Sequence, residues 1–332
     1  MILIITNKED AHPTPVIEYL SGKQFSFASS PIFRLNTEAL LTDYQFNWGC
    51  NDAGIDFYIK NVETGLELRG HEVTAVWERR PEVPTQLLVD NLPEINKHNL
   101  EEGRGFLSFL CYYLKDVFSI GSVVYDRVSA SKMLQLKVAK ELGMKVPATC
   151  FSNRKADVLA FAQDFEYVLL KPISNGNIWL GKEYEYVFYA QKVKSSALDT
   201  HPEEMFSQTV SFVQNYIEKQ YELRITVVNN EVFACKIDSQ LLDDDKGKID
   251  WRQGYNHGLK HEPIDLPENI THFCRRYLEK MNLHFGCFDM IVTPNNEYVF
   301  LECNPNGQWL WIELETGMKI SVAIANALIG VP

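Results

Sequence analysis

The sequence predicts an α/β protein made of α+β lobes, and three observations lead to this class. The chain has 332 residues, a length that favours two domains or one large domain divided into lobes. Short runs of β-branched and aromatic residues alternate with helical patterns along most of the chain. Apolar residues make up 45% and charged residues 23% of the sequence, as in folded globular proteins.

The N-terminal part of the chain is expected to form an α/β domain over residues 1–122. Apolar runs predict strands over 2–5, 25–33, 57–59 and 73–78, and a helix over 15–20. Residues 87–114 carry apolar side chains at helical spacing interrupted at Pro93, which predicts one or two helices. The pattern changes to a connection around 119–126, where we expect the domain to end.

A larger domain is expected over 123–332, with a central lobe at about 123–213 and a C-terminal lobe at about 214–332. Ser129 or Ser131 caps a predicted helix that Gly143 closes. Further helices are expected over 156–165 and 270–281, a strand over 167–170, and either a helix or a strand over 206–213. Two runs, 223–228 and 231–237, flank Asn229-Asn230 and predict a hairpin.

Composition excludes several classes of protein. A net charge of −12 argues against a general nucleic-acid or anionic-membrane binder. Seven scattered cysteines without a CxxC pair are neither a disulfide framework nor a zinc site, and they fit a reducing cytoplasm. The apolar start Met1–Thr6 is too short for a signal-peptide core, and no run is long enough to span a membrane. We expect a cytoplasmic protein that binds neither nucleic acid nor membrane.

A second predicted hairpin carries the clearest chemical signal. Two apolar runs, 288–292 and 298–303, flank a turn rich in Pro and Asn, and a turn centred between residues 295 and 296 places Asp289 opposite Glu302. Directly opposed residues share a face, and Asn304 lies on the same face. Two adjacent carboxylates repel unless a cation lies between them, and the three oxygen ligands suit Mg²⁺. The alternative is the polar outer face of an ordinary hairpin.

Two lysines are candidates for phosphate binding. Lys171 ends a buried strand and precedes a loop of small residues that includes Ser174. Backbone N–H groups of such a loop can approach phosphate oxygens, and an anion would offset the burial of the lysine. Lys132 lies in the first turn of its helix, where a cation opposes the helix dipole and an anionic ligand would resolve the conflict. Solvated surface lysines are the alternative for both.

A short linker separates the two lobes of the larger domain. Gln214, Asn215, Tyr216 and Ile217 can offer backbone groups to an adenine edge, and Glu222 can accept from ribose hydroxyls. Arg224 and Arg252 are candidates to hold a γ-phosphate or a developing oxyanion bidentately. Surface ion pairing is an equally good account of both arginines.

The order of these features resembles the ATP-grasp fold. The resemblance covers about residues 123–332 and is most specific in FDMIVTPNNEYVFLECNPNGQWLWIE, residues 288–313. Several strings extend it to the ligases that cyclise ribosomal peptides of the microviridin, or graspetide, type. They are VWERR (76–80), Lys132 with KVAKELG (137–143), ELRIT (222–226), DWR (250–252) and ECNPNG (302–307). Residues 1–122 then correspond to an N-terminal α/β pre-ATP-grasp domain.

The resemblance implies an activity and a set of ligands. ATP-grasp enzymes bind ATP and Mg²⁺ between two lobes and join a carboxylate to a nucleophile through an acyl-phosphate. The peptide cyclases link Asp or Glu side chains of a precursor peptide to Thr or Ser (a lactone) or Lys (a lactam), guided by a leader peptide. Residues implied to bind ATP are Lys132, Lys171, Ser174, Gln214, Asn215, Tyr216, Ile217 and Glu222. Residues implied to bind the metal are Asp289, Glu302 and Asn304. Arg224 and Arg252 are left for catalysis, because Gly286-Cys287-Phe288 stands where many relatives carry an arginine before the metal aspartate.

The substrate leaves alternatives open. Arg79 and Arg80 are candidates to attract the core carboxylates, with a surface ion-pair cluster to Glu78 and Glu82 as the alternative. We expect a leader helix to dock beside the 223–237 hairpin, and a homodimer, since members of this family often pair. A ligase adding free amino acids to a peptide or protein carboxylate is the competing enzyme. A non-catalytic nucleotide-binding regulator is disfavoured by the intact candidate ligands. Ester and amide products, and the number and order of rings, stay open.

Overall fold

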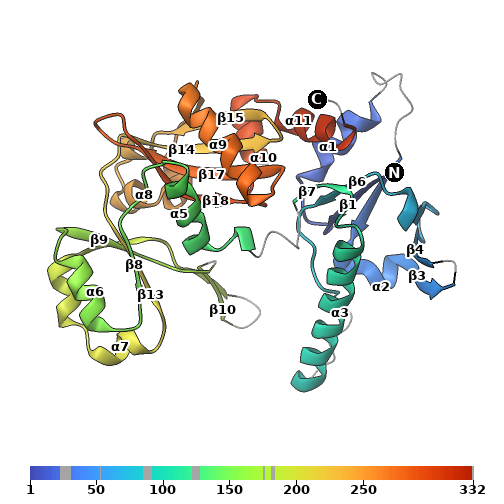
Figure 1. Cartoon of the computed structure of the whole chain (residues 1–332), viewed down its shortest axis with the longest axis horizontal. Coiled ribbons are helices and arrows are strands. Elements are labelled where there is room, and N and C mark those ends of the chain that lie inside the picture. Colours follow the sequence, from blue (N-terminus) through green and yellow to red (C-terminus); the bar gives the residue numbers. More distant parts are fainter. Residues whose placement is uncertain are drawn as a thin grey trace.

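The computed structural model describes residues 1–22, 31–52, 54–84, 92–121, 128–174, 176–180 and 184–330. Figure 1 shows an N-terminal domain (blue to teal), a central lobe (green to yellow) and a C-terminal lobe (orange to red). Helices and strands alternate in the first of these and are mixed in the other two, as the sequence predicts. None of the helices in the described part of the chain is long and apolar enough to cross a membrane.

The N-terminal domain is built on a parallel sheet of order β2-β1-β6-β7. Its strands are β1 (Ile2–Thr6), β2 (Ile32–Asn36), β6 (Ala75–Glu78) and β7 (Phe118–Ile120), and its helices are α1 (Pro13–Ser21), α2 (Leu40–Asp43) and α3 (Pro93–Tyr113). A smaller antiparallel sheet joins β3 (Tyr44–Asn51), β4 (Gly54–Asn61) and β5 (Glu67–Arg69). The strand predicted over 25–33 lies mostly outside the described residues.

Helix α3 is a single helix that begins at Pro93. A proline at the first helical position lacks only an N–H that would have no partner there, so it starts a helix without interrupting it. The part of the helical pattern before residue 92 lies outside the described residues, as does most of the connection predicted around 119–126. The first two residues of that predicted connection, Ser119 and Ile120, belong to strand β7.

The central lobe contains an antiparallel sheet of order β12-β9-β13-β8. Its strands are β8 (Thr149–Ser152), β9 (Tyr167–Lys171), β12 (Gln191–Lys194) and β13 (Ser211–Asn215), with α6 (Lys155–Ala162), α7 (Glu203–Ser207) and the hairpin β10 (Asn177–Leu180)–β11 (Tyr184–Val187). The ambiguous segment 206–213 divides into the end of α7 and the start of β13. This lobe has a small core of its own, around Val158, Val168 and Val213.

The C-terminal lobe is a five-stranded antiparallel sheet of order β16-β15-β14-β17-β18. Its strands are β14 (Tyr221–Val228), β15 (Glu231–Ile237), β16 (His261–Pro263), β17 (Phe285–Val292) and β18 (Tyr298–Asn304). Helix α9 (Glu268–Met281) buries one apolar face of this sheet. The shorter helices are α8 (Asp245–Ile249), α10 (Leu310–Thr316) and α11 (Ile320–Leu328).

The β14–β15 hairpin, predicted over 223–237, forms in the C-terminal lobe. Both strands lie inside the sheet, since β17 pairs with β14 and β16 with β15. Leu223, Ile225 and Ile237 are completely or almost completely buried. Its apolar side chains therefore form part of the core, and docking of a leader helix beside this hairpin stays a prediction.

The hairpin of β17 and β18 has the predicted pairing at the chemically important residues. Asp289 lies opposite Glu302, and Cys287 opposite Asn304. Beyond Asp289 the register shifts by one residue, so that Met290 pairs with Phe300 and Leu301 is left over. Such a bulge bends the strand locally. The turn differs accordingly from the symmetric one assumed, with Asn296 in the left-handed region at φ 59°.

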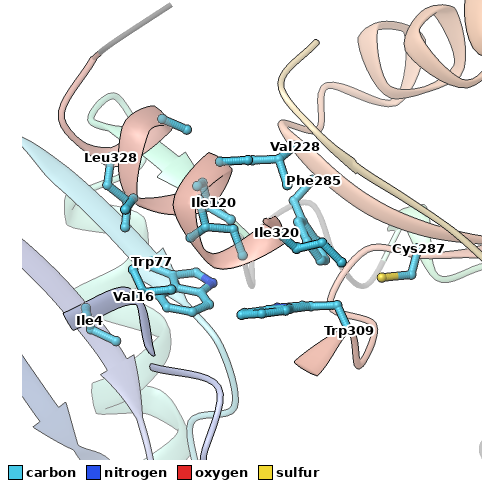
Figure 2. Packing of buried hydrophobic residues seen from close by; sticks show 14 of the residues in the cluster. Ile4, Val16, Trp77, Ile120, Val228, Phe285, Cys287, Trp309, Ile320 and Leu328 are labelled. Atoms are coloured by element: carbon cyan, nitrogen blue, oxygen red, sulfur yellow. The ribbon is translucent and has the colours of Figure 1, made fainter. Parts of the chain in front are cut away.

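One hydrophobic core joins the N-terminal domain to the C-terminal lobe (Figure 2). Ile4, Val16 and Trp77 of the first pack in the same cluster as Trp309 and Ile320 of the second. Helix α5 (Lys132–Glu141), which follows the predicted boundary at 122–123, packs on β18 and α9. The division into an N-terminal domain, a central lobe and a C-terminal lobe stays a proposal. In it, the N-terminal domain and the C-terminal lobe share one hydrophobic core.

Candidate active site

Three adjacent strands of the C-terminal lobe place charged residues in one row. Arg224 on β14 lies opposite Asp289 on β17, which in turn lies opposite Glu302 on β18. Because side chains alternate along a strand, Glu222 shares the face of Arg224, and Asn304 that of Glu302. The other face is apolar and covered by α9. The pairing of these three strands therefore brings the charged side chains together on one face of the sheet.

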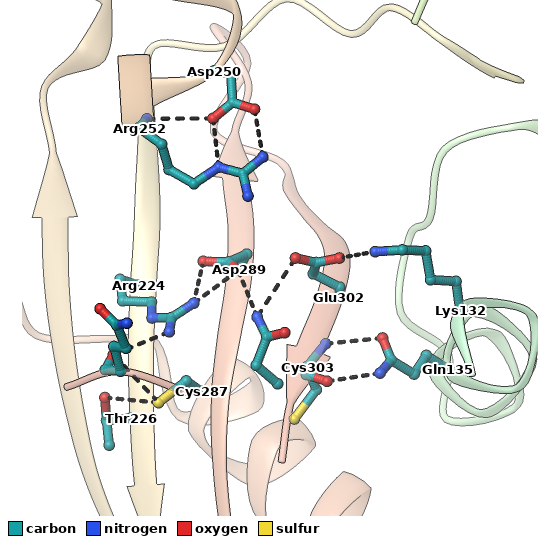
Figure 3. A network of polar contacts seen from close by, with 12 residues as sticks. Lys132, Gln135, Arg224, Thr226, Asp250, Arg252, Cys287, Asp289, Glu302 and Cys303 are labelled. Atoms are coloured by element: carbon teal, nitrogen blue, oxygen red, sulfur yellow. Dashed lines mark hydrogen bonds and ion pairs between the residues drawn. The ribbon is translucent and has the colours of Figure 1, made fainter. Parts of the chain in front are cut away.

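Each carboxylate of the row is paired with a cation (Figure 3). Arg224 donates through Nη1 to both oxygens of Asp289, at 2.9 and 2.8 Å. Lys132 Nζ, from the start of α5, lies 2.5 Å from Glu302 Oε2. Asn304 Nδ2 lies between the carboxylates, 3.1 Å from Asp289 Oδ2 and 3.5 Å from Glu302 Oε1. The repulsion predicted for two opposed carboxylates is thus offset by charges from β14 and α5.

The two carboxylates have different environments. Burial raises the pKa of Asp289 above its ordinary value, although Arg224 acts in the opposite direction. Burial would also raise the pKa of Glu302, but the ammonium groups of Lys132 and Lys171 outweigh it and lower that pKa to about 2. Glu302 is therefore charged at neutral pH.

The donor set fits Mg²⁺ held mainly by its nucleotide. Among the described residues, no group of three or more His, Cys, Asp and Glu side chains forms a self-sufficient metal cage. Asp289, Glu302 and the amide of Asn304 supply hard oxygen ligands from one face. Mg²⁺ is usually bound by one or two carboxylates together with substrate phosphates and water. These three residues suit that role, and their assignment as metal ligands stays a prediction.

Lys171 faces the same site from the central lobe. It is the last residue of β9, pairs in the sheet with Phe212, and donates through Nζ to Gln214 Oε1 at 3.2 Å. Burial lowers its pKa, with Glu302 acting in the opposite direction and Lys132 reinforcing the decrease. The ammonium groups of Lys171 and Lys132 and the carboxylate of Glu302 therefore carry one net positive charge, which an anionic phosphate would neutralise. Ser174, in the loop that follows, is exposed.

The linker between the lobes presents both satisfied and unsatisfied polar groups. Gln214 is buried, and its amide also donates to Thr149 Oγ1 at 3.1 Å. Asn215 Oδ1 is buried without a hydrogen-bond partner among the described residues. The ring of Tyr216 lies under Lys192, whose Nζ is 3.6 Å from the ring centroid, while Ile217 is half-buried. A buried acceptor without a donor is costly, so Asn215 fits a segment that receives a ligand.

Glu222 is held by a lysine that sequence reasoning missed. Lys219 Nζ donates to Glu222 Oε1 at 2.8 Å and to the carbonyl of Ile249 at 3.0 Å. Both side chains of this ion pair are less than a tenth exposed. Burial raises the pKa of Glu222, and Lys219 opposes this. The lysine fixes one carboxylate oxygen of Glu222, and binding of a ribose hydroxyl by Glu222 stays a prediction.

We predict that Lys219→Met weakens ATP binding about tenfold and narrows the preference for ATP over 2′-deoxy-ATP. The reason is that an unpaired, buried Glu222 would lose the orientation that a ribose hydroxyl requires. Titration calorimetry with both nucleotides measures the two effects, and thermal unfolding establishes that the variant is folded. Lys248→Met is the control, since Lys248 forms a solvent-exposed pair with Asp245. An unchanged affinity ratio in a folded Lys219→Met protein would contradict the ribose assignment.

Arg252 is engaged by its own segment. Its Nε and Nη2 donate to the two oxygens of Asp250, at 2.8 and 2.6 Å, and about half of its side chain is exposed. Asp250 also caps the first turn at residue 252. This is the ion pair that sequence analysis offered as the alternative. Arg224, in contrast, is buried and pairs inside the site, so surface ion pairing does not describe it.

The two neighbouring arginines of the N-terminal domain have different surroundings. Arg80 is exposed. Arg79 is 1% exposed and donates through Nη1 to the carbonyl and Oδ1 of Asn306, at 2.7 and 2.8 Å. A surface cluster with Glu78 and Glu82 does not describe Arg79. Its predicted role in attracting core carboxylates stays a prediction.

Gln135 was not among the predicted site residues. Its Nε2 donates to the carbonyl of Cys303, and its Oε1 accepts from the N–H of Cys303, at 2.7 and 3.1 Å. Cys303 lies between Glu302 and Asn304, so Gln135 holds the backbone of the strand that carries them. The available signal was a polar residue at a position where the helix pattern places apolar ones.

Comparison with known proteins gives consistent matches. A family model described as a RimK-like ATP-grasp domain matches residues 129–328. No curated protein sequence gives a significant match. The structure is similar to a RiPP-associated ATP-grasp ligase of Chryseobacterium gregarium, solved with ADP and with a leader and core peptide. The two share 27% identity and a TM-score of 0.88 over 100% of this chain and 97% of that one.

Two macrocyclases of Microcystis aeruginosa MRC are also similar. MdnC, solved with the precursor peptide MdnA, shares 28% identity and a TM-score of 0.84 over 99% of both chains. MdnB shares 25% identity and a TM-score of 0.77 over 99% of this chain and 98% of that one. All three matches include residues 1–128, which precede the part covered by the family model.

Proposed function

Because the chain belongs to the RimK-like ATP-grasp family, we propose that it is an ATP-dependent peptide macrocyclase. It activates Asp or Glu side chains of a ribosomal precursor peptide as acyl-phosphates and joins them to Thr or Ser hydroxyls or to a Lys amine. The observation that carries the proposal is the similarity to leader- and precursor-bound ligases over the whole chain, N-terminal domain included. ATP and Mg²⁺ are the cofactors.

The charges of the site support this chemistry. Bound ATP would supply the phosphoryl group that converts a carboxylate into a reactive acyl-phosphate. In this proposal Lys171 and Lys132 bind phosphate oxygens, and Asp289, Glu302 and Asn304 hold the metal, in keeping with their charges and contacts. Cations aimed at the transferring group stabilise the charge that spreads over its oxygens.

Arg224 and Arg252 divide the remaining catalytic work in this proposal. Arg224 Nη1 is committed to Asp289, and Nη2 donates to the carbonyl of Gln308 at 3.0 Å, so Arg224 orients the metal carboxylate. The half-exposed guanidinium of Arg252 can approach a substrate oxyanion after rearranging its pair with Asp250. We therefore favour Arg252 for oxyanion stabilisation.

The proposed substrate raises an electrostatic problem. The protein carries a net charge of −12, and a core peptide rich in Asp and Glu would be repelled. We propose that a leader peptide provides the affinity and keeps the tethered core at high effective concentration. The leader would then serve several core positions from one docking site.

We predict that deleting the leader slows ring formation far more than raising the ionic strength does. Tethering raises the local core concentration to about the millimolar range, which a free core at micromolar concentration cannot match. Mass spectrometry of the precursor with enzyme, ATP and Mg²⁺ measures the result, because each ring removes one water. Leader supplied in trans is expected to restore part of the rate.

A leaderless core that reacts as fast as the full precursor would contradict this prediction. Mass gain on adding free amino acids, in place of water loss, would favour the competing ligase that extends a peptide or protein carboxylate.

We also propose a homodimer. Exposed apolar side chains on α3 and β3–β4, including Phe46, Ile55, Phe109 and Tyr112, suit a protein interface.

A further inference from the structure

The loop that follows the predicted metal ligands is fixed at several successive residues. Asn304, the last residue of β18, donates to Asp289, and within the loop the carbonyl of Gln308 accepts from Arg224. Gly307 packs so closely that a Cβ there would lie 2.5 Å from Cys287 Cβ and 2.8 Å from Arg224 Nη2. A side chain at residue 307 would displace the arginine that holds Asp289. The position of this loop therefore determines the geometry of the site.

Asn306, in the middle of the loop, is bonded to the N-terminal domain through its carbonyl and its side chain. Its carbonyl and Oδ1 both accept from Arg79 Nη1, and its Nδ2 donates to the carbonyl of Glu78 at 3.0 Å. Glu78 is the last residue of strand β6, and Arg79 follows it directly. A reciprocal set of bonds thus joins the end of a parallel strand to a loop more than 220 residues away in the chain.

Other residues of the N-terminal domain position Arg79. Its Nε lies 3.7 Å from Asp10 Oδ2, and Asp10 also accepts from Thr6 and contacts His12 Nδ1 at 2.7 Å. His12 Nε2 in turn accepts from the N–H of Trp309 at 3.4 Å, just beyond the loop. A buried arginine must be paired to offset its desolvation. Asp10 supplies the countercharge and Asn306 accepts from Nη1, while Nε and Nη2 of Arg79 are buried without a hydrogen-bond partner among the described residues.

We propose that Arg79 is a positioning residue of the ATP site, through which the N-terminal domain fixes the loop that directly follows the metal-facing Asn304. This inference rests on the proposed function. It gives Arg79, which lies outside the ATP-grasp lobes, a part in Mg·ATP binding. It also differs from direct binding of the peptide by Arg79. Residues that orient metal ligands commonly change metal affinity about ten- to a hundredfold when removed.

The experiment measures ATP binding as a function of Mg²⁺ concentration, without peptide, in Arg79→Met and Asn306→Ala proteins. Both are expected to raise the Mg²⁺ concentration for half-maximal ATP binding about tenfold. Asn306→Asp keeps an acceptor for Arg79 and is expected to lie closer to wild type. If Arg79→Met does not fold, Asn306→Ala decides the question alone.

Arg34→Met is the matched control. Arg34 is also a part-buried arginine of the N-terminal domain, and its bonds go to the carbonyls of Asn7 and Asp10 and to Asn36. It is expected to lower the melting temperature without shifting the Mg²⁺ midpoint. The inference is overturned if Arg79→Met and Asn306→Ala lower only the melting temperature. It is also overturned if Arg79→Met raises the KM for peptide at an unchanged Mg²⁺ midpoint. Failure of the wild-type enzyme to cyclise a precursor would refute the proposed function and leave this binding measurement intact.

Discussion

Replacing Glu302 with glutamine is expected to abolish ring formation and ATP consumption while the protein stays folded. Glutamine keeps the shape of the side chain but removes the charge that would hold Mg²⁺ beside Asp289. A metal at such a site supplies several kcal/mol of transition-state stabilisation, so turnover should fall at least about a hundredfold. Coupled detection of ADP release with precursor present measures it.

The melting temperature of Glu302→Gln tests how the charges of the site are compensated in the absence of nucleotide. Two opposed carboxylates alone would repel, and glutamine would then stabilise the protein without nucleotide. Lys132 Nζ lies 2.5 Å from Glu302, however, and holds the pKa of that carboxyl at about 2. We therefore expect Glu302→Gln to melt at a lower temperature than wild type, since it removes the partner of a lysine that is only one-fifth exposed.

Glu297→Gln is the control for Glu302→Gln. Glu297 lies in the turn of the same hairpin and pairs with Lys145 at 2.6 Å, but both side chains are about half exposed. Such surface pairs contribute little, so activity and melting temperature are expected to stay near wild type. Near-wild-type ATP consumption by Glu302→Gln would show that the metal assignment is wrong.

Local patterns in the sequence predicted much of this architecture. Two apolar runs and a turn assumed to be centred between residues 295 and 296 were enough to place Asp289 opposite Glu302. The bulge at Leu301 was missed, because a register assumed from a symmetric turn cannot include a leftover residue. Patterns within one strand or helix are local, whereas a bulge depends on packing against the rest of the sheet.

The partners of the site residues were harder to predict. Arg224 and Lys132 are 65 and 170 residues from the carboxylates they bind, and only the folded sheet brings them together. Arg79 and Arg80 look equivalent in sequence, yet one is buried at the domain junction and the other is exposed. Lys219 and Gln135 carried no motif, because a buried polar residue is recognised by its partners and these come from other elements.

Lys171→Met is expected to raise the KM for ATP and to lower kcat together. Lys171 reaches the site from the central lobe, whose small core is separate from the core that unites the other two parts. Its ammonium would bind the triphosphate in the ground state and stabilise the charge as the γ-phosphoryl group moves. Loss of that charge should reduce kcat/KM about a hundredfold or more. Initial rates over a range of ATP concentrations separate the two parameters.

Two further variants define the role of Lys171. Lys171→Arg keeps the charge, but a planar guanidinium does not replace the compact ammonium that lies 3.2 Å from Gln214 Oε1. We therefore expect Lys171→Arg to restore kcat and the KM for ATP only in part. Lys194→Met, at the exposed end of the neighbouring strand β12, removes a lysine from the same sheet and should leave both parameters unchanged. Lys171→Met with wild-type nucleotide affinity and rate would exclude phosphate binding. An effect on KM alone would mean that the ammonium binds ATP equally in the ground state and the transition state, because only interactions that strengthen during transfer change kcat.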